Sequence, residues 1–486
     1  MNDQILNLEP KNVWKNFYSL TQIPRPSGKE KKVAEFVKKF DEDLGLYVLV
    51  DKVGNVIIRK PAKPGMENRK GIVLQGHLDM VPQKNSSTKH DFEKDPIEAR
   101  INNDWVNANG TTLGADNGIG VAAILSVLES ADINHGQVEA FLTVDEETGM
   151  TGAFGLKAGL FTGDILLNLD SEDEGELYIG CAGGINANMK LSYKEETVKG
   201  NYCAYRLSLT GLKGGHSGLD INLGRGNSNK LIFRFLKNIT RELNARLAGV
   251  EGGSLRNAIP REAFATVVVP LDNLAKFMEK VNSFENIIKS ELALTEPDLK
   301  FSAVKCDLPE KMMDLDSYNI LVNAVYACPN GVVRMSDGIP GLVETSNNLA
   351  IVKSANGTTE ITCLLRSSVD SAKDDLADAV SSVFELAKAN IELSGGYPGW
   401  KPNPDSEILK LMKDLYNRKY GKIPEVKAVH AGLECGLLGC VYPNWDMISF
   451  GPTIRFPHSP DEKVLIPSVQ KFWDYLVETL KNVPLK

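Results

Sequence analysis

The segment Gly-His-Leu-Asp-Met at residues 76–80 constrains this chain more than any other. It follows the short apolar run of residues 71–75, which is typical of a buried strand. Side chains two positions apart on a strand point to the same side, so His77 and Asp79 are expected to project together from the strand end. A histidine that binds a metal usually needs a carboxylate to fix its tautomer. His-x-Asp can supply both parts, although a chance pair at a strand end explains these two residues alone equally well.

Composition places the chain among ordinary globular proteins. Its 486 residues suggest two or three domains, and 42% hydrophobic residues supply ample core material. The net charge of −8 and the absence of a Lys/Arg-rich run argue against a nucleic-acid partner. No apolar run reaches the ~18 residues of a membrane span, and the polar beginning does not resemble a signal peptide. Seven scattered cysteines fit reduced thiols, so we expect a soluble, cytoplasmic protein without a membrane partner.

Strands and helices alternate in the first and last parts of the chain. The apolar runs at residues 71–75, 138–144 and 165–169 are typical of buried strands, and amphipathic periodicity predicts late helices at residues 406–420 and 468–482. This alternation predicts an α/β fold with a mostly parallel central sheet flanked by helices. Functional sites in such sheets lie beyond the carboxyl ends of the strands.

Acidic residues stand where these strands give way to loops. Asp116 lies in a glycine-rich bend that lacks both the P-loop signature and the dinucleotide fingerprint, so phosphate binding is disfavoured. Asp145, Glu146 and Glu147 end one strand, and Asp170 ends another. Neighbouring acids repel one another unless a cation holds them, although most acidic triplets are solvated loops. One shared site explains these positions better than separate coincidences.

Together with a late histidine, these positions make a set of candidate metal ligands. Two imidazoles and three carboxylates suit zinc, cobalt or manganese, and they suffice for two ions if one carboxylate bridges. Glu146 remains beside the ligand Glu147 and can serve as a general base. The candidate ligands are His77, Asp116, Glu147, Asp170 and His458.

The middle of the chain has a different character. Residues 188–397 predict an inserted α+β domain whose order of elements returns once, which favours a doubled insert. A long helix is expected over residues 228–247. The glycine-rich residues 394–399 are expected to be a linker. The catalytic domain would then be split over residues 1–187 and 398–486.

In combination the motifs resemble the cocatalytic zinc peptidases, the family that includes carboxypeptidase G, succinyl-diaminopimelate desuccinylase and dipeptidases. The resemblance spans nearly the whole chain and implies the zinc-peptidase catalytic fold with an inserted lid domain. It rests on the motifs Gly76-His77-Leu78-Asp79, Gly114-Ala-Asp116-Asn117, Asp145-Glu146-Glu147-Thr-Gly149, Asn168-Leu-Asp170 and Pro457-His458-Ser459.

This resemblance implies a role for each candidate ligand. His77 and Asp170 would hold one divalent ion, Glu147 and His458 would hold the other, and Asp116 would bridge the two. The ions would be zinc, with cobalt or manganese as alternatives.

The resemblance also assigns residues to the chemistry. Asp79 would orient His77, and Glu146 would activate the bridging water. In this family the peptide bond after the bridging aspartate, here Asp116–Asn117, is commonly cis.

Substrate contacts are expected mainly from the insert. The resemblance makes His216 the donor to the tetrahedral oxyanion, Asn257 a second polar contact, and Arg366 the partner of the substrate carboxylate. Glu434 is our candidate for binding the α-amino group of a dipeptide, because a buried carboxylate needs such a partner. His430 either lines the site or packs in the core.

The main hypothesis is hydrolysis of small peptides, namely dipeptides of broad sequence with Xaa-His among them. One alternative is a deacylase or desuccinylase of N-acyl amino acids, and another is a metal-binding relative without catalysis. Retention of Glu146 with all the candidate ligands argues against the second alternative. The resemblance also predicts a homodimer formed through the lid domain, in which His216 acts in its own or in the neighbouring subunit.

Overall fold

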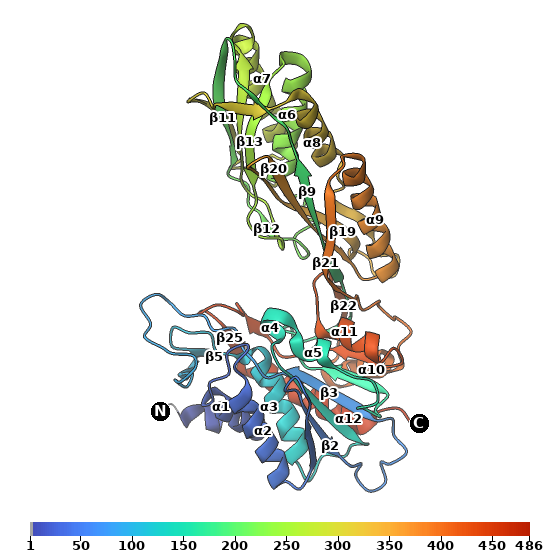
Figure 1. Ribbon diagram of the computed structural model, residues 1–486. Helices are drawn as coiled ribbons and strands as arrows, with labels where there is room; N and C mark the ends of the chain where they lie inside the picture. The colour runs from blue at the N-terminus through green and yellow to red at the C-terminus, as the bar shows by residue number, and fades with distance from the viewer. Residues whose placement is uncertain (1–2) are drawn as a thin grey trace. The chain divides into compact units, whose positions relative to one another are not determined.

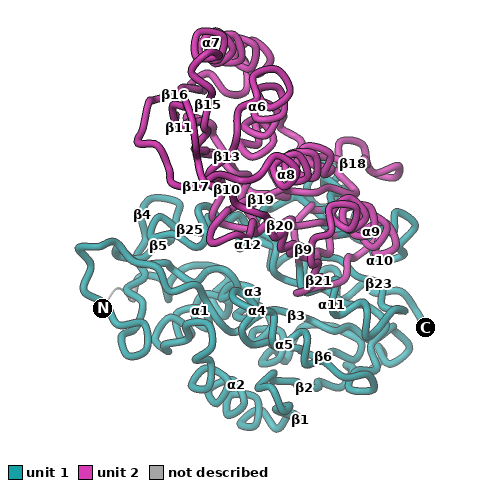
Figure 2. The backbone as a smooth tube through the Cα atoms, turned by 45° about the horizontal axis from the view of Figure 1, so that its top comes forward, with its two compact units in different colours: residues 1–180, 402–428, 433–486 teal, residues 181–401, 429–432 magenta. Residues whose placement is uncertain are grey.

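The computed structural model describes residues 3–486, which form two compact units (Figures 1 and 2). Of the described residues, unit 1 contains 3–180, 402–428 and 433–486. Unit 2 consists of residues 181–401 and 429–432. The chain therefore leaves unit 1 twice, once for the long insert and once for four residues.

A mixed sheet forms the middle of unit 1. Within residues 3–486 it has eight strands in the order β1-β2-β6-β3-β7-β23-β8-β22. The central strands β6, β3, β7 and β23 are parallel, as the alternation of strands and helices predicts. The strands are β1 (Tyr47–Val50), β2 (Val56–Lys60), β3 (Ile72–His77), β6 (Val138–Thr143), β7 (Ile165–Asn168), β8 (Glu176–Cys181), β22 (Glu425–Val429) and β23 (Asp446–Ser449).

Helices cover this sheet and bury its central strands completely. Every residue of β3, β6 and β7 is buried, because strands covered on both faces need apolar side chains on both. Helix α3 is apolar around its whole circumference and packs on β3 and α1. The helices of unit 1 are η1 (Asp3–Asn7), α1 (Lys11–Thr21), α2 (Lys31–Asp43), α3 (Ala115–Glu129), α4 (Glu146–Gly149), α5 (Thr151–Gly155), α10 (Glu407–Tyr420), α11 (Glu434–Val441) and α12 (Ile466–Asn482).

A second, small sheet in unit 1 carries the loop that contains His458. Its strand order is β24-β25-β5-β4. The strands are β4 (Ala99–Asn102), β5 (Trp105–Ala108), β24 (Ile454–Arg455) and β25 (Lys463–Leu465). Because β24 and β25 pair with each other, the loop of residues 456–462 is anchored at both of its ends.

Unit 2 is built on one large sheet. Within the described residues it has nine strands, eight of them in the path β16-β11-β15-β13-β19-β20-β9-β21, with β18 paired to β19. Its two halves meet where β13 pairs with β19. The strands are β9 (Gly183–Ser192), β11 (Tyr202–Thr210), β13 (Arg246–Gly252), β15 (Ala263–Pro270), β16 (Lys300–Cys306), β18 (Gly331–Met335), β19 (Val343–Ala355), β20 (Thr358–Ser367) and β21 (Asn390–Tyr397).

Four helices pack apolar side chains against this sheet and share one core with it. They are α6 (Ser228–Leu243), α7 (Leu274–Glu291), which follows the short η2 (Leu271–Asn273), α8 (Leu315–Ala327) and α9 (Asp370–Leu386). Two short ladders complete the unit: β10 (Glu195–Thr197) with β17 (Lys311–Met313), and β12 (Gly215–His216) with β14 (Ala258–Ile259). Among residues 3–486, no helix has the length and hydropathy needed to cross a bilayer.

Two predictions about elements of the insert were wrong. The helix expected over residues 228–247 ends at Leu243, because Asn244 adopts a left-handed conformation (φ 52°) that ends it. The following residues form β13, which is held by ladders to β15 and β19. The linker expected at residues 394–399 is partly strand, because β21 continues to Tyr397 along β9 with an irregular register that accommodates its glycines.

Asp41, in the last turn of α2, has a buried side-chain carboxyl group. Its side chain is 0% exposed, and neither oxygen has a hydrogen-bond partner among the described residues. Burial raises the pKa of Asp41 to about 7; Glu129 adds to the shift and Lys60 opposes it. The folded protein therefore keeps this carboxyl protonated at pH values where the unfolded chain has lost the proton.

Replacing Asp41 by asparagine should stabilise the protein progressively as the pH rises. Between the unfolded pKa near 3.8 and the folded pKa of about 7, the native state holds the extra proton, so a rising pH costs the wild type stability. The variant lacks this cost. The difference in free energy of unfolding between Asp41→Asn and wild type should grow by about 2–3 kcal/mol from pH 5 to pH 8, measured by urea unfolding. A constant difference over this range would contradict a buried, protonated carboxyl.

Candidate metal centre

The candidate ligands converge beyond the carboxyl ends of the parallel strands in unit 1. His77 ends β3, Asp170 follows β7, and Glu147 lies in α4 just after β6. Asp116 lies in the first turn of α3, and His458 lies in the loop between β24 and β25. Among the described residues, three groups have ligand atoms within 4.8 Å of one another: His77, Asp116 and Asp170; Asp116, Glu147 and His458; and His77, Glu146 and Glu147.

Asp116 stands between the two histidines. Its Oδ1 lies 3.1 Å from Nε2 of His77, and its Oδ2 lies 3.2 Å from Nε2 of His458. Asp170 Oδ1 is 3.3 Å from the His77 nitrogen, and Glu147 Oε2 is 2.9 Å from the His458 nitrogen. Each imidazole nitrogen therefore faces one oxygen of Asp116 and one oxygen of a further carboxylate. Asp116 therefore belongs to both groups of candidate ligands.

Burial and the charges of neighbouring acids both disfavour the ionised forms of these carboxyl groups. Burial, with the charges of Asp116 and Glu147 adding to it, raises the pKa of Asp170 to about 7. Burial also raises the pKa of Glu146 well above its usual range. Hydrogen bonds to Asp116 and Glu147 raise the pKa of His458 to about 11. The cluster thus favours bound protons, or other cations in their place.

The donor set fits divalent cations. Among residues 3–486, the ion pairs of Asp116, Glu147 and Asp170 are made only with His77 and His458. Glu147 Oε1 and Asp170 Oδ1 are buried and accept no hydrogen bond from the described part of the chain. Imidazole nitrogens with carboxylate oxygens form the ligand set of zinc, cobalt and manganese sites.

Asp79 connects a candidate ligand to the candidate base. Its Oδ1 lies 3.3 Å from Nδ1 of His77, which leaves Nε2 of the ring to face the centre. The same carboxylate accepts the backbone N–H groups of Glu146 (3.1 Å) and Glu147 (3.2 Å) and the hydroxyl of Ser27 (2.8 Å). Although burial opposes it, these contacts, led by His77, lower the pKa of Asp79 to about 2. The ionised carboxylate of Asp79 therefore positions His77 at the end of β3 and the backbone of Glu146 and Glu147 at the start of α4.

The bend at Asp116 follows the family expectation. The peptide bond Asp116–Asn117 is cis, and Asp116 departs from helical geometry within α3 (φ −81°, ψ 113°). The side chain of Asn117 donates to the carbonyl of Leu169 at 2.6 Å. The segment of Asp116 is thus tied to the residue that precedes Asp170.

Glu434 is buried in unit 1. Its side chain is 1% exposed, and its Oε2 accepts hydrogen bonds from Gln75 and from Thr143. Burial raises the pKa of Glu434 to about 7. Gln75, two residues before His77, also accepts from Asn168, so these side chains form a buried polar chain across β6, β3 and β7. Glu434 Oε1 has no hydrogen-bond partner among the described residues.

The other predicted residues belong to unit 2. Nδ1 of His216 accepts the backbone N–H groups of Gly218 (3.2 Å) and Leu219 (3.0 Å), so the proton of the neutral ring is on Nε2. Burial lowers the pKa of His216, and Arg366 lowers it further. The carbonyl of Asn257 accepts the N–H of Ser217 at 2.9 Å, which places Asn257 beside the His216 loop.

Arg366 and His430 complete this cluster of unit 2. Arg366 is 5% exposed and donates to the hydroxyl of Tyr397 at 2.9 Å, whereas its Nε has no partner among the described residues. His430 lies 2.7 Å from the hydroxyl of Ser346 through Nε2. Burial lowers the pKa of His430 to about 3, and the charges of Arg366 and His216 lower it further. His430 is therefore a neutral, buried neighbour of the arginine.

Sequence reasoning missed two buried charged residues that bind the backbone next to the candidate ligands. Arg25 and Glu462 are each 2% exposed, and both bind the backbone beside candidate ligands. Each stands in a polar stretch that is typical of an exposed loop. The available signal was the position of Glu462, four residues after His458.

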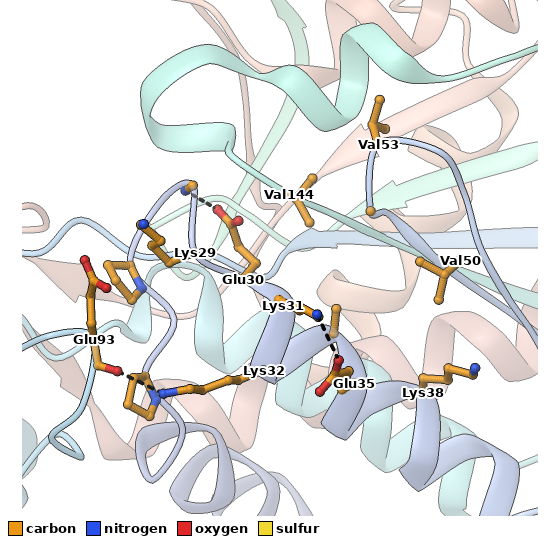
Figure 3. Close-up of a pocket in the computed structure, with 15 residues that line it drawn as sticks. Lys29, Glu30, Lys31, Lys32, Glu35, Lys38, Val50, Val53, Glu93 and Val144 are labelled. Carbon is orange, nitrogen blue, oxygen red and sulfur yellow. Dashed lines mark hydrogen bonds and ion pairs between the residues drawn. The ribbon is translucent and has the colours of Figure 1, made fainter.

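A separate cavity of about 700 Å³ lies in unit 1 at the start of α2 (Figure 3). Two of its lysines have local partners: Lys31 reaches Glu35 at 4.0 Å, and Lys32 donates to the backbone carbonyl of Glu93 at 2.9 Å. The described residues that line it include none of the candidate ligands. This cavity is therefore separate from the candidate metal centre.

Known proteins share this architecture along the whole chain. The family model for peptidase family M20/M25/M40 matches residues 73–482. The cytosol non-specific dipeptidase of Escherichia coli K12 is 47% identical over 483 residues, which cover 99% of this chain and 100% of the relative.

Solved structures agree. Aminoacylhistidine dipeptidase from Vibrio alginolyticus is 50% identical with a TM-score of 0.95, covering 99% of this chain and 98% of the other. Aminopeptidase PepT from Bacillus cereus shares the fold at 16% identity, with a TM-score of 0.62 and coverage of 98% and 99%. The chain belongs to peptidase family M20/M25/M40.

Proposed function

We propose that this chain is a metal-dependent dipeptidase that hydrolyses dipeptides of broad sequence, with Xaa-His among its substrates. The observation that carries the proposal is Asp116 between His77 and His458, with Glu146 beside them. The Escherichia coli and Vibrio relatives, which are named as dipeptidases, support the substrate class. The name of the Escherichia coli relative also supports a location in the cytoplasm.

Divalent metal ions are the cofactors that the family implies, and we assign two per chain, zinc first with cobalt or manganese as alternatives. His77 and Asp170 would hold one ion, Glu147 and His458 the other, and Asp116 both. When bound, such ions lower the pKa of a water molecule and polarise the scissile carbonyl.

The proton transfer is assigned to Glu146. Its carboxylate takes the proton of the attacking water and passes it to the leaving amine. The raised pKa of Glu146 suits a group that holds a proton between these steps. Asp79 keeps the acceptor in place through the backbone of Glu146 and Glu147.

Residues of both units are assigned to the substrate. His216 donates its Nε2–H to the oxyanion, which its tautomer supports. Arg366 pairs with the substrate carboxylate, and Asn257 adds a polar contact. Glu434 receives the α-ammonium group through Oε1, the oxygen that has no partner among residues 3–486.

We assign the inserted residues 188–397 as a lid that also forms a homodimer. The split catalytic domain would then comprise residues 1–187 and 398–486. In this arrangement His216 serves the metal centre of its own chain or that of the neighbour.

Free Ala-His should be cleaved, and N-acetyl-histidine should not, by metal-stripped protein refilled with zinc, manganese or cobalt. Stripping should abolish the activity, because the carboxylates and imidazoles alone cannot polarise the carbonyl. Release of histidine measures both reactions. Cleavage of N-acetyl-histidine alone would identify a deacylase instead. Cleavage of neither compound by protein that binds metal would favour a non-catalytic relative.

Exchange of His216 for alanine should leave metal content unchanged and lower kcat by about 10²–10³, because one oxyanion donor is lost. His90→Ala, in a polar loop of unit 1, is the matched control and should keep full activity. A loss within about threefold for His216→Ala would contradict the oxyanion role. Mixing inactive His216→Ala with inactive Glu146→Gln should restore activity if the histidine acts across the dimer, and should not if it acts within one chain.

A further inference from the structure

We propose that Arg25 and Glu462 are positioning residues that support different halves of the metal centre. Arg25 holds the ligand segments on the side of His77, and Glu462 holds those on the side of His458. The inference rests on the metal centre of the proposed function, but it is independent of the substrate. It concerns how strongly each metal is bound.

Glu462 gathers the backbone that leads into Asp116. Its two carboxylate oxygens accept the N–H groups of Leu113 (2.8 Å), Gly114 (3.0 Å), Ala115 (2.7 Å) and Asp116 (3.3 Å). Two of these groups, those of Ala115 and Asp116, begin α3. The first N–H groups of a helix have no partner within the helix, and a carboxylate beside them also interacts favourably with the helix dipole. Here the side chain that satisfies them comes from another part of the chain.

That other part is the loop of His458. Glu462 follows His458 by four residues and directly precedes β25, which pairs with β24 and β5. The carboxylate therefore joins the loop that presents His458 to the turn that presents Asp116. The distance between these two ligands is set by a contact that does not involve the metal.

Arg25 makes the corresponding connection on the other side. Its Nη1 donates to the carbonyls of Leu78 (2.9 Å) and Asp79 (2.8 Å), just after His77. Its Nη2 donates to the carbonyl of Gly114 at 2.5 Å, two residues before Asp116. The guanidinium thus joins the end of β3 to the start of α3.

Gly114 is where the two contacts meet. Its N–H binds Glu462 and its carbonyl binds Arg25. Its backbone is left-handed (φ 69°), and a Cβ here would lie only 2.6 Å from Arg25 Nη2. The turn before Asp116 is therefore held through both its donor and its acceptor groups, and it leaves no room for a side chain.

The two residues do not serve the two sites equally. In the group His77, Asp116 and Asp170, Arg25 binds beside two of the three ligands and Glu462 beside one. In the group of Asp116, Glu147 and His458, Glu462 binds the backbone of Asp116 and lies in the loop of His458. Arg25 binds the backbone beside Asp116 only. Loss of either residue should therefore weaken one site more than the other.

Zinc titration of metal-stripped, full-length protein tests this division. Two reference backgrounds each keep one ligand group: Asp170→Asn keeps the group with His458, and His458→Ala keeps the group with His77. Glu462→Gln and Arg25→Lys are introduced into each background, and isothermal titration calorimetry measures the Kd of zinc. Both exchanges keep the approximate size of the side chain.

We expect a crossed pattern of losses. Glu462→Gln should weaken zinc about 10- to 100-fold in the Asp170→Asn background and by a smaller factor in the His458→Ala background. Arg25→Lys should show the reverse order. Equal losses in both backgrounds, or no loss in either, would overturn the proposal.

Two controls separate this result from other failures. Thermal unfolding of the metal-free proteins tests for a purely structural role. In that case an exchange would lower stability and would not weaken one zinc site more than the other. If Glu462→Gln does not fold, Glu462→Asp, which keeps the charge but shortens the side chain, takes its place. If the unmodified chain binds two zinc ions without cleaving dipeptides, the proposed function fails and this inference is still decided by the titrations.

Discussion

Repulsion among the closely spaced acids of unit 1 is the constraint on which the rest of this centre depends. Asp116, Glu146, Glu147 and Asp170 lie in one small region, and within residues 3–486 the ion pairs of Asp116, Glu147 and Asp170 are made with the two histidines. Carboxylates at such a density are stable only when protons or metal ions compensate them. Other contacts of the fold must therefore hold these groups close together when no proton or metal ion compensates their charge.

The fold does so with contacts to the backbone. The parallel strands β3, β6 and β7 bring His77, the acidic turn and Asp170 to the same edge of the sheet. Asp79 binds the N–H groups at the start of α4, and Glu462 binds those at the start of α3. Such bonds fix a ligand's main chain and leave its side-chain oxygens available, which is what a metal site requires.

The sequence was most informative about functional residues whose positions are set by the period of a strand or helix. The two-residue period of a strand predicts that His77 and Asp79 project together, and they do, at 3.3 Å. Arg25 and Glu462 were beyond this reasoning because their partners are backbone groups, which leave no pattern in side-chain identity. The strand β13 was missed for a related reason: its ladder partners are distant in sequence, and a helical period extends into it. Glu434 was named from the sequence, but its contacts with Gln75 of β3 and Thr143 of β6 were not, because these partners are distant in sequence.

The most direct test of this account is anomalous diffraction from crystals of the zinc-loaded protein. The account predicts two zinc peaks in unit 1, one between His77 and Asp170 and one between Glu147 and His458, with an oxygen of Asp116 directed at each. A single peak, or a pair that Asp116 does not bridge, would contradict it.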